Sequence, residues 1–288
     1  MKKAYIYAGI SILFWSSLAT VSKLLLGELN SYQVLTYSAA FAALALLIVG
    51  AVTGKLKLLR AYGIKDYVIT LLIGLPGTFL YYVFLYMGTE RMAASQAFII
   101  NYLWPIMSVV FACIILKERL TWRKCAAFAL SILGVVTVAG RELIQFDGET
   151  LSGVLLCVLA AVSYGAFTAL NNKWSYDYVI SMMLSFALSA ILSLIINLSM
   201  GGSLAVSILH LLGFGWNGVF VMALATVTWA LALKEGGTAK ISSLAYITPF
   251  LSLIWTYLVL REPISPLSIV GLMLIVLGIF MQLKEKKK

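Results

Sequence analysis

The chain has 288 residues, of which 62% are hydrophobic and only 11% are charged, and its formal net charge is +10. Soluble domains carry about 25% charged residues, so a chain this apolar is expected to lie in lipid. The basic residues stand between long apolar runs, which identifies them as topology signals and argues against nucleic-acid binding. We therefore expect membrane lipid and a small-molecule substrate as partners, and no nucleic acid.

Ten apolar segments approach the length of roughly 20 residues with which a helix crosses a bilayer. In chain order they cover residues 4–26, 32–53, 67–88, 93–116, 122–140, 150–170, 178–199, 213–233, 239–260 and 264–283. Apolar residues lie on nearly every side of these helices, a pattern typical of helices surrounded by lipid or by a buried bundle. The sequence therefore predicts an all-α membrane protein with ten transmembrane helices.

Lysine and arginine are distributed unevenly over the connecting segments. With the N-terminus in the cytoplasm, the cytoplasmic segments carry 17 of these residues, the opposite loops carry 3, and Lys23 lies inside the first span. Lysine and arginine favour the cytoplasmic side of a membrane. The distribution predicts a multi-pass protein of the cytoplasmic (inner) membrane with both termini in the cytoplasm.

The two halves of the chain match each other at an offset of 144 residues. The matching pairs include Tyr102 and Tyr246, Pro105 and Pro249, and Glu118 and Glu262. Each half holds five predicted helices, an odd number, so the second half enters the membrane from the opposite side. We expect two domains, residues 1–144 and 145–288, related as an inverted-topology repeat. In secondary transporters such repeats enclose a substrate site near the membrane midplane.

Four short motifs carry a resemblance to a known family. Phe14–Ser17 reads FWSS, Asn101–Pro105 reads NYLWP, and Lys117–Leu120 and Arg261–Ile264 read KERL and REPI. Together they resemble the EamA-type branch of the drug/metabolite transporter superfamily, although Ser16 replaces the glycine of its FWG-like motif. The NYLWP segment is similar to that of its aromatic amino-acid exporters. The resemblance covers the whole chain.

The resemblance implies an arrangement of helices and a function. Helices 1, 3, 4, 6, 8 and 9 would surround a central cavity, while helices 5 and 10 would be peripheral. The chain would act as a monomer or as a homodimer formed through the peripheral helices. The implied function is export of amino acids, including aromatic ones, across the membrane.

Polar aromatic side chains fall in the middle of several predicted helices. A buried hydroxyl or indole N–H needs a hydrogen-bond partner, which either a water-filled cavity or packing between helices can supply. Two further candidates are Asn101, whose amide lies inside helix 4, and Lys23. The predicted substrate-binding residues are Trp15, Lys23, Tyr81, Asn101, Tyr102, Trp104, Tyr164, Trp229 and Tyr246.

Three candidate residues, Lys23, Pro105 and Pro249, have two interpretations each. The ammonium of Lys23 either reaches the membrane surface or faces the cavity, where it would bind a substrate carboxylate. Pro105 and Pro249 each remove a helical hydrogen bond and free the carbonyl four residues earlier. They are predicted either as hinges or as static kinks.

Catalysis and metal binding are not expected. None of the eleven acidic residues lies in the middle of a span, so paired carboxylates for acid–base chemistry are missing there. One histidine, His210, and three scattered cysteines give no metal-ligand pattern, and we predict no metal and no cofactor. The resemblance, together with Lys23 as the one charge placed inside a span, favours amino-acid export over uptake of a quaternary amine such as choline, held by cation–π contacts, and over a non-transporting receptor.

Overall fold

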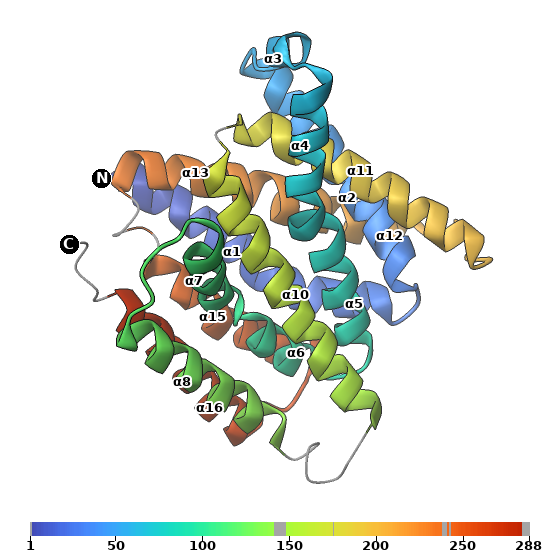
Figure 1. Ribbon diagram of the computed structural model, residues 1–288. Coiled ribbons are helices and arrows are strands. Elements are labelled where there is room, and N and C mark those ends of the chain that lie inside the picture. The colour runs from blue at the N-terminus through green and yellow to red at the C-terminus, as the bar shows by residue number, and fades with distance from the viewer. Residues whose placement is uncertain (1, 141–147, 175, 238–240, 242, 284–288) are drawn as a thin grey trace.

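The computed structural model describes residues 2–140, 148–174, 176–237, 241 and 243–283. These residues are almost entirely helical, and none of them lies in a β-strand (Figure 1). The predicted all-α fold is therefore confirmed for this part of the chain. The predicted boundary between the halves, at residues 144 and 145, lies outside the described residues.

The first half contains five membrane helices, two of which are composed of several pieces. They are α1 (Lys2–Leu26); α2 (Ser31–Val52), followed by the short α3 (Lys57–Ala61); the third, formed by α4 (Ile64–Leu75), the π-helix η1 (Pro76–Leu80) and α5 (Tyr81–Glu90); the fourth, broken into α6 (Ala94–Asn101) and α7 (Trp104–Ile115); and α8 (Trp122–Val138). The helix ends differ from the predicted ones by a few residues, because loops and caps rather than hydropathy set them.

The second half likewise contains five membrane helices. They are α10 (Gly148–Lys173); α11 (Tyr178–Ser199); the eighth membrane helix, formed by α12 (Ile208–Gly215), the π-helix η2 (Trp216–Leu224) and α13 (Ala225–Gly236); the ninth, formed by the 3-10 helix η3 (Ser243–Ile247), α15 (Thr248–Trp255) and the π-helix η4 (Thr256–Leu260); and α16 (Pro266–Leu283). Within the described ranges, seven helices are long and apolar enough to cross a membrane, and the remaining spans are shorter.

Unusual backbone features recur at the offset of 144 residues. Lys117 and Arg261, which are 144 positions apart, are the two non-glycine residues with a positive φ among those described, at 56° and 57°. The π-helix η1 falls on the last five residues of η2 after the same shift. The second half thus repeats the first in backbone conformation as well as in sequence.

Helices α2 and α11 pack along each other and are joined at both ends. Lys55 Nζ lies 2.8 Å from Asp177 Oδ2 at the end where α1 begins, which we call the N-terminal end of the bundle. At the opposite end, Asn30 Nδ2 donates to Asn197 Oδ1 at 2.9 Å. We call this second end the Glu262 end, because the loop that carries Glu262 lies there.

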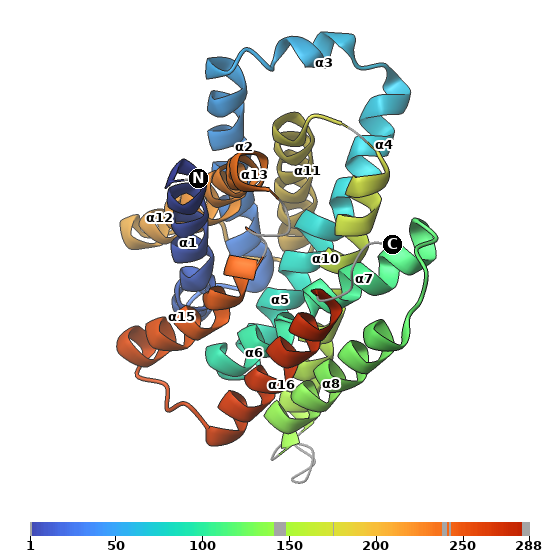
Figure 2. The same cartoon turned by 90° about the vertical axis from the view of Figure 1, so that its left-hand side faces the viewer.

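Helices α8 and α16 form a separate pair at one side of the bundle (Figure 2). Leu133 and Leu277, which occupy equivalent positions in the two halves, are both exposed on this pair. This arrangement agrees with the peripheral placement that the family resemblance implies. A homodimer through these helices stays a prediction.

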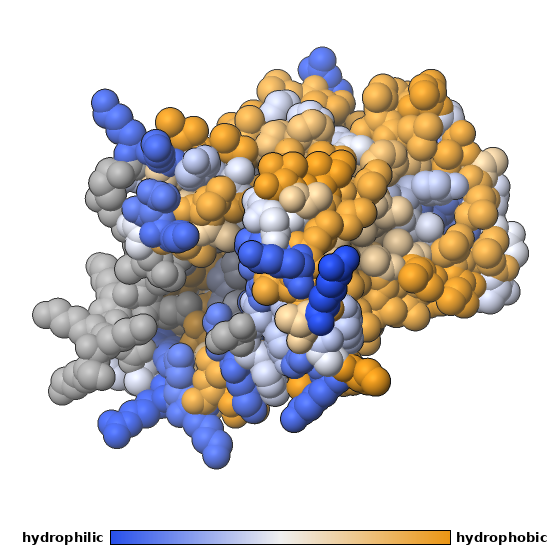
Figure 3. All heavy atoms as spheres, turned by 90° about the horizontal axis from the view of Figure 1, so that it is seen from above, coloured by the Kyte–Doolittle hydropathy of each residue, from blue (hydrophilic) through white to orange (hydrophobic). Residues whose placement is uncertain are grey.

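The surface of the molecule is apolar over large areas (Figure 3). Hydrophilic side chains gather toward the side on which the termini lie, and the opposite part of this face is mostly hydrophobic. Exposed leucine and isoleucine side chains such as Leu44, Leu72, Ile195 and Leu212 would be costly in water. A bilayer removes that cost, because lipid tails are as apolar as these side chains.

Candidate functional site

The predicted aromatic residues form two groups on different helices. In the first group, Trp15 of α1 contacts Trp229 of α13, with ring centroids 5.2 Å apart. In the second, the Tyr164 ring of α10 lies 4.8 Å from that of Tyr81 and 5.1 Å from that of Trp104. All of these rings except Tyr81 are partly exposed. Ring surface therefore remains available to a ligand in both groups.

Asn101 lies beside the second group, at the break between α6 and α7. Its Nδ2 atom donates to Tyr81 OH at 3.0 Å, and its buried Oδ1 atom has no hydrogen-bond partner within the described residues. A buried acceptor without a partner costs roughly 1–3 kcal/mol unless water or a ligand supplies a donor. Asn101 Oδ1 is thus the polar atom in this region best suited to accept a hydrogen bond from a ligand.

Tyr102 joins the two halves at the second helix break. Pro249 is the second residue of α15, so it leaves the carbonyl of Ala245 without its helical donor. The Tyr102 hydroxyl donates to that carbonyl. The equivalent tyrosine of the second half, Tyr246, instead packs against Phe280 of α16, with ring centroids 5.1 Å apart. These two equivalent tyrosines therefore have different surroundings in the two halves.

The two prolines occupy equivalent places in their helices. Pro105 is the second residue of α7, as Pro249 is of α15, and a break in the helix precedes each of them. Proline is well accommodated in the first turn of a helix because that N–H has no helical acceptor. The structure thus places both candidate hinges at breaks, and their movement stays a prediction.

Lys23 lies at the Glu262 end, about 12 Å along α1 from Trp15 at 1.5 Å per residue. Its ammonium donates to the carbonyls of Thr89 and Met92 at 2.7 and 2.8 Å. Carbonyls at the end of a helix lack helical donors, so Lys23 satisfies them and ties α1 to the end of α5. Both interpretations of Lys23, reaching the membrane surface and facing the cavity, stay predictions. Binding of a substrate carboxylate by Lys23 stays a prediction.

Glu262 makes a contact that sequence reasoning missed. Its carboxylate accepts hydrogen bonds from the backbone N–H groups of Ala94 at 2.9 Å and Ser95 at 3.1 Å. The first N–H groups of a helix have no acceptor within it, and a negative charge there is favoured by the helix dipole. Glu262 of the second half therefore caps α6 of the first half. Its sequence equivalent, Glu118, is half exposed and pairs with Lys124 at 3.1 Å.

These contacts close the bundle at the Glu262 end. Lys23, Tyr102 and Glu262 form hydrogen bonds that link α1, the ninth helix and the loop after it to the third and fourth helices. All of them lie at this end or at the helix breaks. Packing agrees, because every α6 side chain except Gln96 is buried, whereas only Ile106 and Met107 are buried in α7.

The side chains of the site are of types that bind small organic molecules. In the part of the chain that the structure describes, no three side chains of histidine, cysteine, aspartate or glutamate come together as metal ligands. The aromatic groups and the Asn101 amide offer ring faces, hydroxyls and an amide oxygen, which can hold a small organic molecule with an apolar body.

Two repeated five-helix halves, broken helices and polar aromatics beside the breaks define a multi-pass membrane transporter. The model of the EamA-like transporter family matches the chain twice, over residues 2–140 and over residues 151–283. The chain belongs to this family. The two matched regions correspond to the two structural halves.

Known relatives cover most of the chain at low identity. An uncharacterized transporter of Clostridium kluyveri is 24% identical over 100% of this chain and 95% of its own length. The aromatic amino acid exporter YddG of Ancylobacter novellus is 25% identical over 62% of this chain and 63% of its own length. A probable terminal-alkyne amino-acid exporter of Streptantibioticus cattleyicolor is 23% identical over 88% of this chain and 85% of its own.

A solved crystal structure shares the fold. It superposes with a TM-score of 0.70 and 21% identity, covering 98% of this chain and 96% of that chain. The arrangement of all ten helical spans is therefore one that an experimentally determined protein also adopts.

Proposed function

We propose that the protein exports amino acids, aromatic ones among them, across the cytoplasmic membrane by alternating access. The observation that carries the proposal is the second aromatic group beside the unpartnered Asn101 Oδ1. An aromatic substrate side chain would stack on the exposed faces of Trp104 and Tyr164, and a substrate ammonium would donate to the amide oxygen. The names of two relatives, both amino-acid exporters, support this substrate class.

The proposed direction requires an orientation of the bundle. The positive-inside bias of the loops places the N-terminal end in the cytoplasm and the Glu262 end outside. The contacts at the Glu262 end support a state in which the site is reached from the cytoplasm. Export then needs a second state, in which the contacts of Lys23, Tyr102 and Glu262 open and α7 closes.

Cysteine labelling tests the orientation. In a variant without the three native cysteines, Glu149→Cys is expected to react with an impermeant maleimide added to intact cells. Arg60→Cys, in α3 at the N-terminal end, is expected to react only after the membrane is permeabilised. Labelling of position 60 in intact cells, or protection of position 149, would reverse the orientation and with it the direction of transport.

Replacement of Trp104 by alanine is expected to lower amino-acid transport about tenfold while leaving the folded yield near that of the parent. The reason is that Trp104 is partly exposed and contributes one of the ring faces of the site, and stacked aromatic pairs contribute roughly 0.5–1.5 kcal/mol beyond area burial. Trp122→Ala is the matched control, because Trp122 is 69% exposed at the start of α8 and lies outside the aromatic groups. Equal transport by both variants would remove Trp104 from the site.

A ligand screen distinguishes the substrate classes. Purified protein is heated with single amino acids, choline and nucleosides, and a ligand that binds the folded state raises the midpoint of unfolding. We expect the largest shifts with aromatic amino acids. Shifts with choline alone would favour uptake of a quaternary amine, and binding without flux in proteoliposomes would indicate a receptor.

A further inference from the structure

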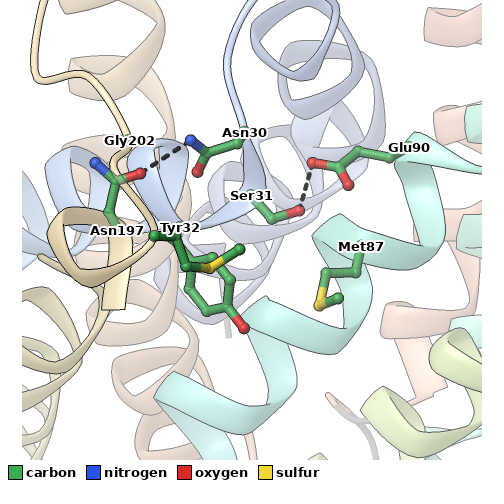
Figure 4. Close-up of a pocket in the computed structure, with 8 residues that line it drawn as sticks. Asn30, Ser31, Tyr32, Met87, Glu90, Asn197 and Gly202 are labelled. Atoms are coloured by element: carbon green, nitrogen blue, oxygen red, sulfur yellow. Dashed lines mark hydrogen bonds between the residues drawn. The ribbon is translucent and has the colours of Figure 1, made fainter. Parts of the chain in front are cut away.

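A cavity lies at the Glu262 end, lined by residues outside the aromatic groups (Figure 4). Its volume is about 220 Å³, and it is lined by the start of α2, the end of α5 and the end of α11 with the residues that follow. The lining residues are Asn30, Ser31, Tyr32, Met87, Glu90, Asn197, Met200 and Gly202. A volume of this size accommodates a small organic molecule or the head of a larger one.

The walls of this cavity are held in place by their own hydrogen bonds. Ser31 Oγ donates to Glu90 Oε1 at 2.7 Å, which fixes the carboxylate against the first turn of α2. On the other side, Asn30 Nδ2 donates to Asn197 Oδ1, and Asn197 Nδ2 donates to the carbonyl of Ser203 at 3.1 Å. Both amides are therefore occupied within the protein. Glu90 Oε2 is left as a strong acceptor without a partner in the described part of the chain.

The charge of the cavity favours a cation. None of its eight lining residues is basic, and Glu90 is the one charged residue among them. At the same end of the bundle, the ammonium of Lys23 is held by the carbonyls of Thr89 and Met92. Arg91, the residue after Glu90, donates through Nη1 to the carbonyl of Met87, so its guanidinium is engaged by the backbone and Glu90 stays the one charged side chain in the lining. Glu28, another acid at this end, pairs with His210 at 3.0 Å.

The remaining walls suit the apolar part of such a ligand. Tyr32 is one of the lining residues and is drawn between Asn197 and Met87 in the view of Figure 4. An aromatic ring attracts an ammonium group placed over its face. Met87 and Met200 add polarisable thioethers, which adapt to ligands of different shapes.

We propose that this cavity is a binding site for an organic ammonium group, with Glu90 Oε2 as the acceptor and Tyr32 as the ring beside it. The site is separate from the aromatic groups, so it does not depend on which substrate is transported. At the outer surface of the membrane, the ammonium can come from a free amine or from the ethanolamine head of a phospholipid.

The test uses the purified full chain and n-butylammonium, which joins a primary ammonium to a short apolar tail. The ligand is expected to raise the midpoint of thermal unfolding in a saturable manner, whereas n-butanol and butanoate at equal ionic strength are not. Glu90→Gln keeps the shape and the bond from Ser31, and it is expected to weaken binding about tenfold or more, the scale of a charge-assisted hydrogen bond. Glu28→Gln is the matched control and is expected to bind like the parent.

Tyr32 gives a second, independent readout. Tyr32→Phe keeps the ring face and is expected to bind like the parent, while Tyr32→Ala is expected to bind roughly 2–5-fold more weakly, the scale of an exposed cation–π contact. Mass spectrometry distinguishes a free amine from a lipid head as the ligand. The protein is released from membranes that contain phosphatidylethanolamine and phosphatidylglycerol, and the lipids that stay bound are identified. If the parent retains phosphatidylethanolamine, and Glu90→Gln loses it while its phosphatidylglycerol is unchanged, the ligand is the lipid head.

Two results would overturn the proposal. One is parent-like affinity of the folded Glu90→Gln variant for n-butylammonium. The other is a parent protein that neither responds to n-butylammonium nor retains phosphatidylethanolamine. Transport of amino acids could still be normal in either case, so failure of this site and failure of the proposed function are distinguishable.

Discussion

Replacement of Gly218 by alanine is expected to reduce the folded yield sharply, whereas the same replacement at Gly215 is expected to be tolerated. A Cβ atom at Gly218 would lie 2.3 Å from the carbonyl oxygen of Ser38 and 2.9 Å from the backbone nitrogen of Ala42. Backbone atoms cannot rotate away, so α2 and the eighth helix would have to separate. A Cβ atom at Gly215 would meet no atom within 4 Å.

The two variants should therefore change stability in opposite directions. Alanine favours a helix over glycine by about 1 kcal/mol, and this gain applies at Gly215. At Gly218, overpacking is expected to cost about 1–3 kcal/mol or more. Fluorescence-detected size exclusion and the midpoint of thermal unfolding measure both. If Gly218→Ala gives as much folded protein as Gly215→Ala, the close packing of η2 against α2 is wrong.

Replacement of Glu262 by glutamine is expected to open the Glu262 end of the bundle. Glutamine lacks the charge and has one acceptor oxygen, so it cannot satisfy both Ala94 N–H and Ser95 N–H. Hydrogen bonds to charged groups contribute about 1.5–3 kcal/mol each, and about 1.4 kcal/mol changes an equilibrium tenfold. The closed state should therefore lose at least about tenfold in population relative to the open state.

Labelling from outside intact cells measures that shift. Tyr164→Cys, on the wall of the aromatic site and in a variant without native cysteines, is expected to react faster with an impermeant maleimide when Glu262→Gln is present. Glu118→Gln is the matched control, because Glu118 occupies the equivalent position but is paired with Lys124 and half exposed. Unchanged labelling with Glu262→Gln, or the same acceleration with Glu118→Gln, would contradict a closing role for Glu262.

The positions of the helices could be predicted from the sequence because hydropathy determines which segments enter lipid. The offset of 144 residues likewise indicated two halves, which the two matches of the family model support. The π-helices η1 and η2 and the left-handed Lys117 and Arg261 could not be predicted. They depend on how helices fit against each other, which no local pattern of apolar residues encodes.

The candidate site shows the same division. Side-chain type and position alone selected Trp15, Trp104, Tyr164 and Trp229, because polar aromatics in mid-span need partners, and their role in binding stays a prediction. The contacts of Lys23 and Glu262 could not be predicted, since their acceptors and donors are backbone groups more than 60 residues away in sequence. The repetition of Glu118 at Glu262 shows that the two loops are equivalent in sequence. It does not show which helix end either glutamate caps.

Counterflow in proteoliposomes tests the central claim most directly. Vesicles that contain the purified protein are loaded with unlabelled phenylalanine and diluted into a trace of the labelled amino acid. An alternating-access transporter of aromatic amino acids is predicted to accumulate label transiently, and Trp104→Ala is predicted to accumulate far less. Folded parent protein that exchanges no amino acid under these conditions would contradict the account.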